Sequence, residues 1–119
     1  MKSLVTVAIA DDHPVLLAGI ASLLSSDQHY RILGQADTAD ASLELVRQVS
    51  PDVLILDLSM PGDVFRAISQ IAAARPNTKV LVFTAFCSID SALKALDAGA
   101  TGFVLKGSPF TELLEAIET

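Results

Sequence analysis

Short apolar runs alternate along this chain with longer segments in which apolar residues recur at helical spacing. Nearly every position of the first run, residues 4–10, is apolar, which is typical of a strand that is buried on both faces of a parallel sheet. The predicted strands cover residues 4–10, 31–36, 53–56, 79–84 and 102–105. A helix is predicted after each strand, and four of the five have clear limits, at residues 14–25, 64–74, 88–98 and 109–117.

Turn and capping residues support these limits. Pro14 suits the first turn of the first helix, where its missing N–H costs nothing. The second helix begins after a cap at Asp37 or Thr38 and stops at Pro51. Gly99 closes the fourth helix.

The regular alternation of strand and helix predicts an α/β fold with a parallel sheet. At a length of 119 residues the common solution is a flavodoxin-like, doubly wound (βα)5 sandwich with strand order 2-1-3-4-5. The whole chain, residues 1–119, is then one domain.

Composition excludes several classes of protein. Hydrophobic residues make up 51% of the chain, so extended disorder is not expected. No apolar run approaches the roughly 18 residues that a membrane span needs. The net charge is −6 and the basic residues are scattered, so we expect no direct binding of nucleic acid. The single Cys87 cannot form an internal disulfide, which agrees with a cytoplasmic location.

Polar side chains follow four of the predicted strands. Asp11 and Asp12 end the first strand, Asp57 the third, Thr84 the fourth and Lys106 the fifth. Ligands of such folds bind at the carboxyl ends of the strands, so these side chains are expected to converge on one pocket. Taken singly, each is an ordinary residue of a strand end, turn or helix cap.

Three neighbouring carboxylates repel one another unless a cation lies between them. Mg²⁺, or Mn²⁺ in its place, suits a site of a few carboxylates, water and phosphate. One of these carboxylates can then attack phosphorus and form an acyl phosphate. Lys106 and the Thr84 hydroxyl can hold the phosphoryl oxygens.

The order of these motifs identifies a resemblance. Over residues 4–117 the chain resembles the response-regulator receiver family, and most closely its NarL/LuxR-type subgroup. The matching segments are Ala10-Asp11-Asp12-His13-Pro14, residues 52–62 (DVLILDLSMPG), 80–85 (VLVFTA), 98–106 (AGATGFVLK) and 109–117.

The resemblance implies a phosphoacceptor at Asp57. It implies a metal ion held directly by Asp12, through water by Asp11, and by the backbone carbonyl of Ser59. It also implies that a histidine kinase donates the phosphoryl group. The loop after Gly62 is about one residue shorter than the family pattern, which bears on the metal coordination.

Other roles follow from the same resemblance. Thr84 and Lys106 would contact the phosphoryl oxygens, and Phe103 would rotate inward when Thr84 moves, although a plain core aromatic is an equal interpretation. A further expectation comes from the chemistry of hydrolysis, which needs a water molecule in line behind phosphorus: Ser59 and Phe86, each two residues past a site residue, would control the access of this water. His13 is expected only to pack at the start of the first helix.

The subgroup also carries expectations for the whole protein. Its regulators normally have a C-terminal helix-turn-helix domain, so we expect a DNA-binding output domain to follow residue 119 in the full-length protein. Phosphorylation would then favour a homodimer that pairs the output domains. Transcription would be the regulated process.

Two other functions compete with this one. A phosphohydrolase of the haloacid-dehalogenase kind also uses a nucleophilic Asp, but it needs a second Asp where this chain has Ser59. A degenerate receiver, which binds partners without phosphorylation, would not need the complete set of acidic residues with Thr84 and Lys106.

Overall fold

The computed structural model describes residues 4–85 and 88–118. Strands and helices alternate without exception in this part of the chain. The strands are β1 (Val5–Ala10), β2 (Tyr30–Ala36), β3 (Val53–Leu56), β4 (Lys79–Thr84) and β5 (Gly102–Leu105). The helices are α1 (Pro14–Ser25), α2 (Ala39–Val49), α3 (Val64–Ala74), α4 (Ile89–Ala98) and α5 (Phe110–Glu118).

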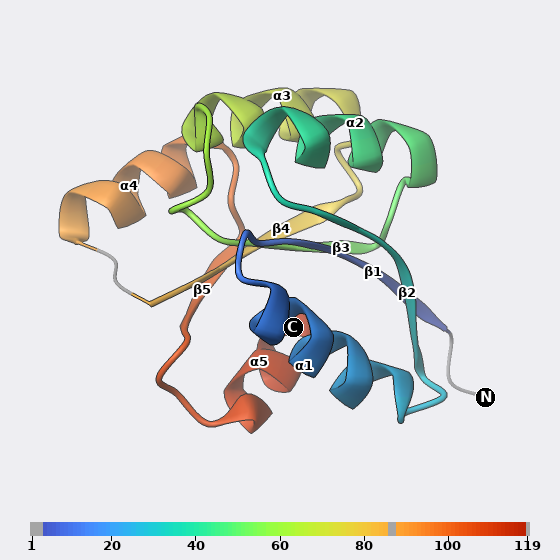
Figure 1. The fold of residues 1–119 in the computed structure, drawn as a ribbon. Helices are drawn as coiled ribbons and strands as arrows, with labels where there is room; N and C mark the ends of the chain where they lie inside the picture. Colours follow the sequence, from blue (N-terminus) through green and yellow to red (C-terminus); the bar gives the residue numbers. More distant parts are fainter. Residues whose placement is uncertain (1–3, 86–87, 119) are drawn as a thin grey trace.

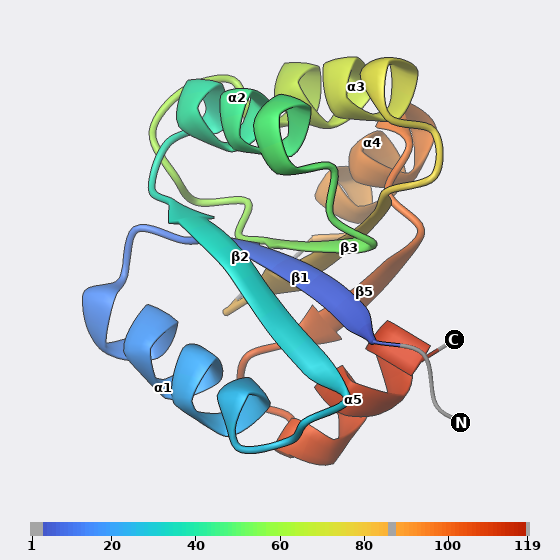
Figure 2. The same cartoon turned by 90° about the vertical axis from the view of Figure 1, so that its right-hand side faces the viewer.

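The five strands form one parallel sheet in the order β2-β1-β3-β4-β5. Helices α2, α3 and α4 cover one face of the sheet, and α1 and α5 cover the other (Figures 1 and 2). This three-layer arrangement confirms the predicted flavodoxin-like sandwich.

Alternate residues of each central strand point to opposite helical layers. In β1, Ala8 and Ala10 pack with the α2–α4 layer, whereas Val7 and Ile9 pack with α1 and α5. All four are at most 1% exposed. Burial on both faces is the reason that these strands are apolar at most positions rather than at every second one.

The helix ends follow the chemistry of their caps. Thr38, and not Asp37, caps α2, because its Oγ1 accepts a hydrogen bond from the Ala41 N–H at 3.0 Å. Ser88 is the N-cap residue of α4 and precedes the first helical residue, so this helix begins one residue later than predicted. Gly99 ends α4 with φ of 126°, a conformation that favours glycine.

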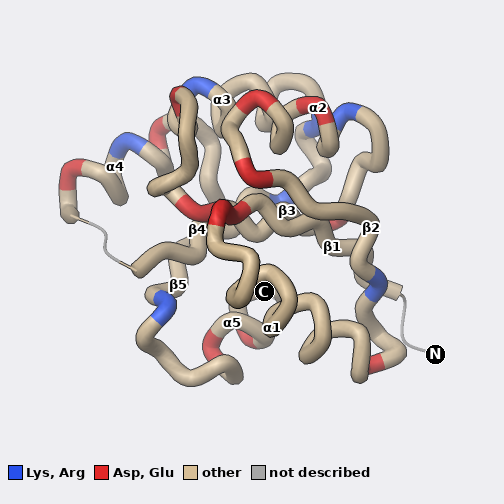
Figure 3. Tube along the Cα trace, in the orientation of Figure 1, with Lys and Arg blue, Asp and Glu red and all other residues tan. Residues whose placement is uncertain are grey.

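The carboxyl ends of the strands lie along one edge of the sheet. Acidic positions gather where β1 and β3 end, and a basic position follows β5 (Figure 3). Among the described helices, none has the length and apolar character needed to cross a membrane.

Candidate functional site

Backbone hydrogen bonds hold the acidic residues side by side just past the strands. The Asp11 N–H donates to the Ala36 carbonyl, and the Asp57 N–H donates to the Ala10 carbonyl, both at 2.9 Å. These bonds extend the ladders of the sheet by one residue beyond β1 and β3. The first and third strand ends are thereby fixed as neighbours.

Four side chains meet at this point. Single ligand atoms from Asp11, Asp12, His13 and Asp57 all lie within 4.8 Å of one another. Asp11 and Asp57 are 2% and 1% exposed, whereas Asp12 lies open to solvent. The structure thus places two buried carboxylates beneath an accessible one.

Lys106 brings a positive charge to the two buried carboxylates. Its N–H donates to the Thr84 carbonyl at 2.9 Å, which fixes the residue at the end of β5. Its Nζ lies 2.8 Å from Asp11 Oδ2 and 3.3 Å from Asp57 Oδ2. Lys106 therefore compensates part of the negative charge that burial would otherwise make costly.

Asp57 is held ionised by its surroundings. Burial alone would raise the pKa of this carboxyl group. Hydrogen bonds from the Ser59 hydroxyl, at 2.9 Å, and from the Ser59 N–H, at 3.2 Å, together with the Lys106 charge, outweigh burial and leave the pKa below its ordinary value. A buried, charged and oriented carboxylate is suited to nucleophilic attack.

Thr84 and Phe103 lie on the two strands next to this cluster. Thr84 ends β4 and is 2% exposed. It stands two residues beyond Val82, which is the register partner of both Leu56 in β3 and Phe103 in β5. Phe103 is half-buried and packs against the α2–α4 layer. The proposed water-access residue Phe86 lies outside the described residues.

His13 belongs to the site, which the sequence interpretation missed. Its side chain is 60% exposed, and its Nδ1 lies 2.7 Å from Asp11 Oδ1. The expected packing role at the start of α1 is therefore wrong, because the ring lies over the carboxylates instead. The one available signal was its position directly after Asp11 and Asp12 in the sequence.

The donor set fits a hard divalent cation. Three carboxylates against one lysine leave an excess of negative charge, and oxygen atoms are the ligands that Mg²⁺ prefers. Both oxygens of Asp11 already accept hydrogen bonds or ion pairs, from His13 and Lys106. Asp12 is the open carboxylate, so it can reach an ion with the least rearrangement.

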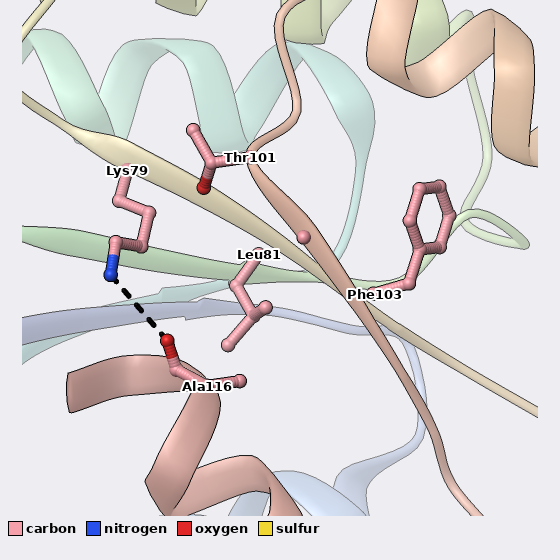
Figure 4. Close-up of a pocket in the computed structure, with 6 residues that line it drawn as sticks. Lys79, Leu81, Thr101, Phe103 and Ala116 are labelled. Atoms are coloured by element: carbon pink, nitrogen blue, oxygen red, sulfur yellow. Dashed lines mark hydrogen bonds between the residues drawn. The ribbon is translucent and has the colours of Figure 1, made fainter. Parts of the chain in front are cut away.

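Of the hollows among the described residues, one lies away from this cluster and another borders it. A pocket of about 340 Å³ is lined by residues of β4, β5 and α5, and in it Lys79 Nζ lies 3.4 Å from the Ala116 carbonyl (Figure 4). Since Lys79 begins β4, this pocket is at the opposite end of the strand from Thr84. In the same view the Phe103 ring points away from Lys79 and Ala116.

The second hollow is an apolar groove beside the cluster. It has a volume of about 580 Å³ and shares His13 and Lys106 with the site. Its other lining residues come from α1, from the end of β4 and from the start of α5, and they are Val15, Leu16, Gly19, Ile20, Leu23, Phe83, Ala85 and Phe110. The groove thus runs along α1 and includes His13 and Lys106, which contact the carboxylates.

Comparison with known proteins places this site in context. The model of the response regulator receiver domain family matches residues 7–118. The chain is 31% identical over 115 residues to the response regulator GacA of Pseudomonas aeruginosa, covering 96% of this chain and 54% of GacA. It is 36% identical over 114 residues to the probable transcriptional regulatory protein NarL of Mycobacterium tuberculosis, covering 95% of this chain and 53% of NarL.

A solved structure agrees with these matches. The signal receiver domain of the putative response regulator NarL from Mycobacterium tuberculosis superposes with a TM-score of 0.90 at 35% identity, covering 98% of this chain and 94% of that one. The chain spans about half the length of the curated relatives that it matches.

Proposed function

Because this chain belongs to the response regulator receiver domain family, we propose that it accepts a phosphoryl group on Asp57 from a histidine kinase, with Mg²⁺ or Mn²⁺ bound. The observation that carries the proposal is the position of Asp57. Its buried, ionised carboxylate lies against Asp11, Asp12 and Lys106 in a single cluster.

The transfer needs a charged nucleophile and a means to spread charge on phosphorus. An Asp57 oxygen attacks phosphorus as the bond from phosphorus to the donor histidine nitrogen breaks. We assign contacts with the phosphoryl oxygens to Lys106, whose Nζ lies 3.3 Å from Asp57 Oδ2, and to the hydroxyl of Thr84, which ends the neighbouring strand β4. The metal ion, when bound, neutralises charge on the same oxygens.

Asp12 is the carboxylate of this cluster that lies open to solvent, which supports it as a direct metal ligand. We assign the other direct contacts to Asp57 and to the backbone carbonyl of Ser59, as in the pattern of the receiver family. Asp11 would act through a water molecule, because direct coordination would break its contacts with His13 and Lys106. No second Asp stands at position 59, so the acid that a phosphohydrolase of the haloacid-dehalogenase kind needs is missing there.

The apolar groove along α1 supports the partner that we propose. It opens at His13 and Lys106, so a helix of a kinase that lay in it would carry a phosphohistidine toward Asp57. Val15, at the edge of the groove, is 88% exposed. An exposed apolar side chain at this place is suited to contact with a partner.

We propose that the output is transcriptional. NarL of Mycobacterium tuberculosis is named a probable transcriptional regulatory protein, and RcsB of Salmonella enterica has been solved bound to promoters in the presence of a phosphoryl mimic. The present chain has a net charge of −6, so DNA contacts would come from an output domain and not from this one. Phosphorylation would favour a homodimer, and the protein would act in the cytoplasm.

A single experiment separates the candidate functions. The protein is incubated with acetyl phosphate and Mg²⁺, and its intact mass is measured while release of phosphate from a phosphomonoester is followed in parallel. The proposal predicts one added phosphoryl group and no turnover of the ester. Steady turnover would support a phosphohydrolase, and an unchanged mass would support a receiver that works by binding alone.

A further inference from the structure

The proposed phosphoryl transfer gives no role to His13, although its imidazole lies inside the site. Its Nδ1 is 3.2 Å from Asp12 Oδ1 and 3.6 Å from Asp57 Oδ2. On its other side the same nitrogen is 2.7 Å from Asp11 Oδ1 and 3.4 Å from Lys106 Nζ. The ring nitrogen therefore sits among the oxygens that would hold a metal ion.

These separations match those between ligands of a single ion. With bonds of about 2.1 Å, neighbouring ligands lie about 3.0 Å apart in an octahedron and about 3.4 Å apart in a tetrahedron. The distances of 3.2 and 3.6 Å from His13 Nδ1 to the Asp12 and Asp57 oxygens are close to these values. One ion can contact all three atoms after a small movement of the side chains.

The ring is also able to turn away. His13 occupies the N-cap position of α1, but its side chain makes no capping hydrogen bond to the helix. With 60% of the side chain exposed, little packing holds it in place. A rotation about its side-chain bonds would leave the start of α1 intact, because Pro14 needs no N–H partner.

Cations differ in their preference for such a nitrogen. Mg²⁺ keeps oxygen ligands and several waters, whereas imidazole suits the later first-row ions such as Co²⁺, Ni²⁺ and Zn²⁺. We propose that His13 sets the cation selectivity of this site: its Nδ1 binds a later first-row ion together with Asp12 and Asp57, and the ring turns aside when Mg²⁺ binds. The inference rests on the proposed function, because both kinds of ion would share the same carboxylates.

The coordination needs no change in the charge of the ring. In its contact with the Asp11 carboxylate, which can only accept, Nδ1 carries a proton; when the metal binds, the single proton of the neutral ring is on Nε2 instead, and the lone pair of Nδ1 is available to the metal. The contact that is lost is the one between Nδ1 and Asp11 Oδ1, which keeps its hydrogen bond from the His13 N–H at 2.9 Å. His13 thus adds a ligand without removing one.

The test is a pair of binding titrations on metal-free protein. Calorimetry gives the affinities for Co²⁺ and for Mg²⁺, and the visible absorption of Co²⁺ reports whether nitrogen is among its ligands. The variant is His13→Ser, since Ser is a favoured N-cap residue that keeps α1 folded but cannot reach the ion. The matched control is His29→Ser, at the only other histidine of the chain.

The expected result is a loss of Co²⁺ affinity in His13→Ser of about tenfold or more, a typical scale for changes around a metal ligand. Mg²⁺ affinity should be unchanged or higher, and the Co²⁺ spectrum should change only in this variant. If the ratio of Co²⁺ affinity to Mg²⁺ affinity and the Co²⁺ spectrum were the same in His13→Ser and in wild type, the inference would be overturned. The proposed function would remain intact. Ion binding that persists undiminished in Asp12→Asn would overturn both.

Discussion

The Asp57 carboxylate accepts hydrogen bonds from three donors. The Ser59 hydroxyl and N–H and the Lys106 ammonium group all contact it, and they lower its pKa in spite of its burial. Burial of a charge normally weakens a protein, so this arrangement has a cost that the local donors offset. The same donors orient the carboxylate for attack.

Removal of one donor should reverse part of this effect. In Ser59→Ala the hydroxyl bond to Asp57 is lost, so we expect the pKa of Asp57 to rise relative to wild type. Carbon-detected NMR of the carboxyl group across a pH titration measures the change. A midpoint that stays the same, or falls, would show that the hydroxyl does not hold the charged form.

Because the pKa of Asp57 is lowered in the folded protein, the protonation of Asp57 should make the protein less stable at acidic pH. The native state favours the ionised form of Asp57, so this group stabilises the fold at any pH above its pKa in the unfolded chain, about 3.9. The stabilisation is lost as the pH falls through the lower pKa that Asp57 has in the folded protein. In Ser59→Ala this acid-dependent contribution should be smaller.

The lifetime of the phosphoryl group should depend on Ser59 and Phe86, which stand two positions after Asp57 and Thr84 in the sequence. Ser59 is short, and the Phe86 side chain is apolar, so neither is suited to hold water in line behind phosphorus. The double variant Ser59→Asn with Phe86→Glu should therefore lose its phosphoryl group faster than wild type once the donor is removed. Decay followed by intact mass over time tests this, and equal rates would refute water control by these residues.

Much of the site could be predicted from strand ends alone. Asp11, Asp12, Asp57 and Lys106 meet because a parallel sheet brings its carboxyl ends to one edge. The direction of a side chain at a helix start is not set by such a pattern. The position of the His13 ring over the carboxylates consequently could not be read from the sequence.

At the scale of elements, α1 connects the site to a surface on which a partner can lie. Its exposed Val15 borders the apolar groove that opens at His13 and Lys106. Transfer from a kinase should depend on this surface, whereas transfer from a small donor should not. A comparison of the two phosphoryl donors therefore distinguishes an effect on kinase docking from an effect on the transfer reaction itself.

Val15→Ser should slow transfer from a phosphorylated histidine kinase several-fold and leave labelling by acetyl phosphate unchanged. The loss of apolar contact explains the direction, since burial of a Val side chain contributes roughly 1.5–3 kcal/mol. Ile89→Ser is a matched control, because Ile89 begins α4 and is similarly exposed, at 79%. If transfer from the kinase were slowed equally in Val15→Ser and Ile89→Ser, the groove would not be the docking surface.

The limits of the elements show what periodicity can and cannot determine. β3, β4, β5, α1 and α3 begin and end at the predicted residues, since Pro and Gly or changes in apolar pattern mark them clearly. β2 begins one residue earlier than predicted, at Tyr30, whose ring is buried although its hydroxyl is polar. Such residues give no clear signal in a pattern of apolar and polar positions.

For the whole molecule, the excess of negative charge at one edge of the sheet links metal binding to stability. A cation that binds the native state and not the unfolded chain stabilises it by mass action. Millimolar Mg²⁺ should therefore raise the melting temperature of the wild type, by a few degrees for a stabilisation of about 1 kcal/mol.

The same addition should do much less for Asp12→Ala, because the open carboxylate is missing. Thermal unfolding followed by circular dichroism, at fixed ionic strength, measures both proteins. An equal rise in the two would mean that Mg²⁺ acts elsewhere on the surface and that Asp12 is not a ligand.

The central claim is that Asp57 itself carries the phosphoryl group. The direct measurement is to label the protein with acetyl phosphate and Mg²⁺, reduce the acyl phosphate with borohydride, and locate the reduced residue by peptide mass spectrometry. We expect the reduced residue at position 57 in wild type and in the exposed-site control Asp97→Asn, and no labelling in Asp57→Asn. Full labelling of Asp57→Asn, or a reduced residue at another position in the wild type, would contradict the account.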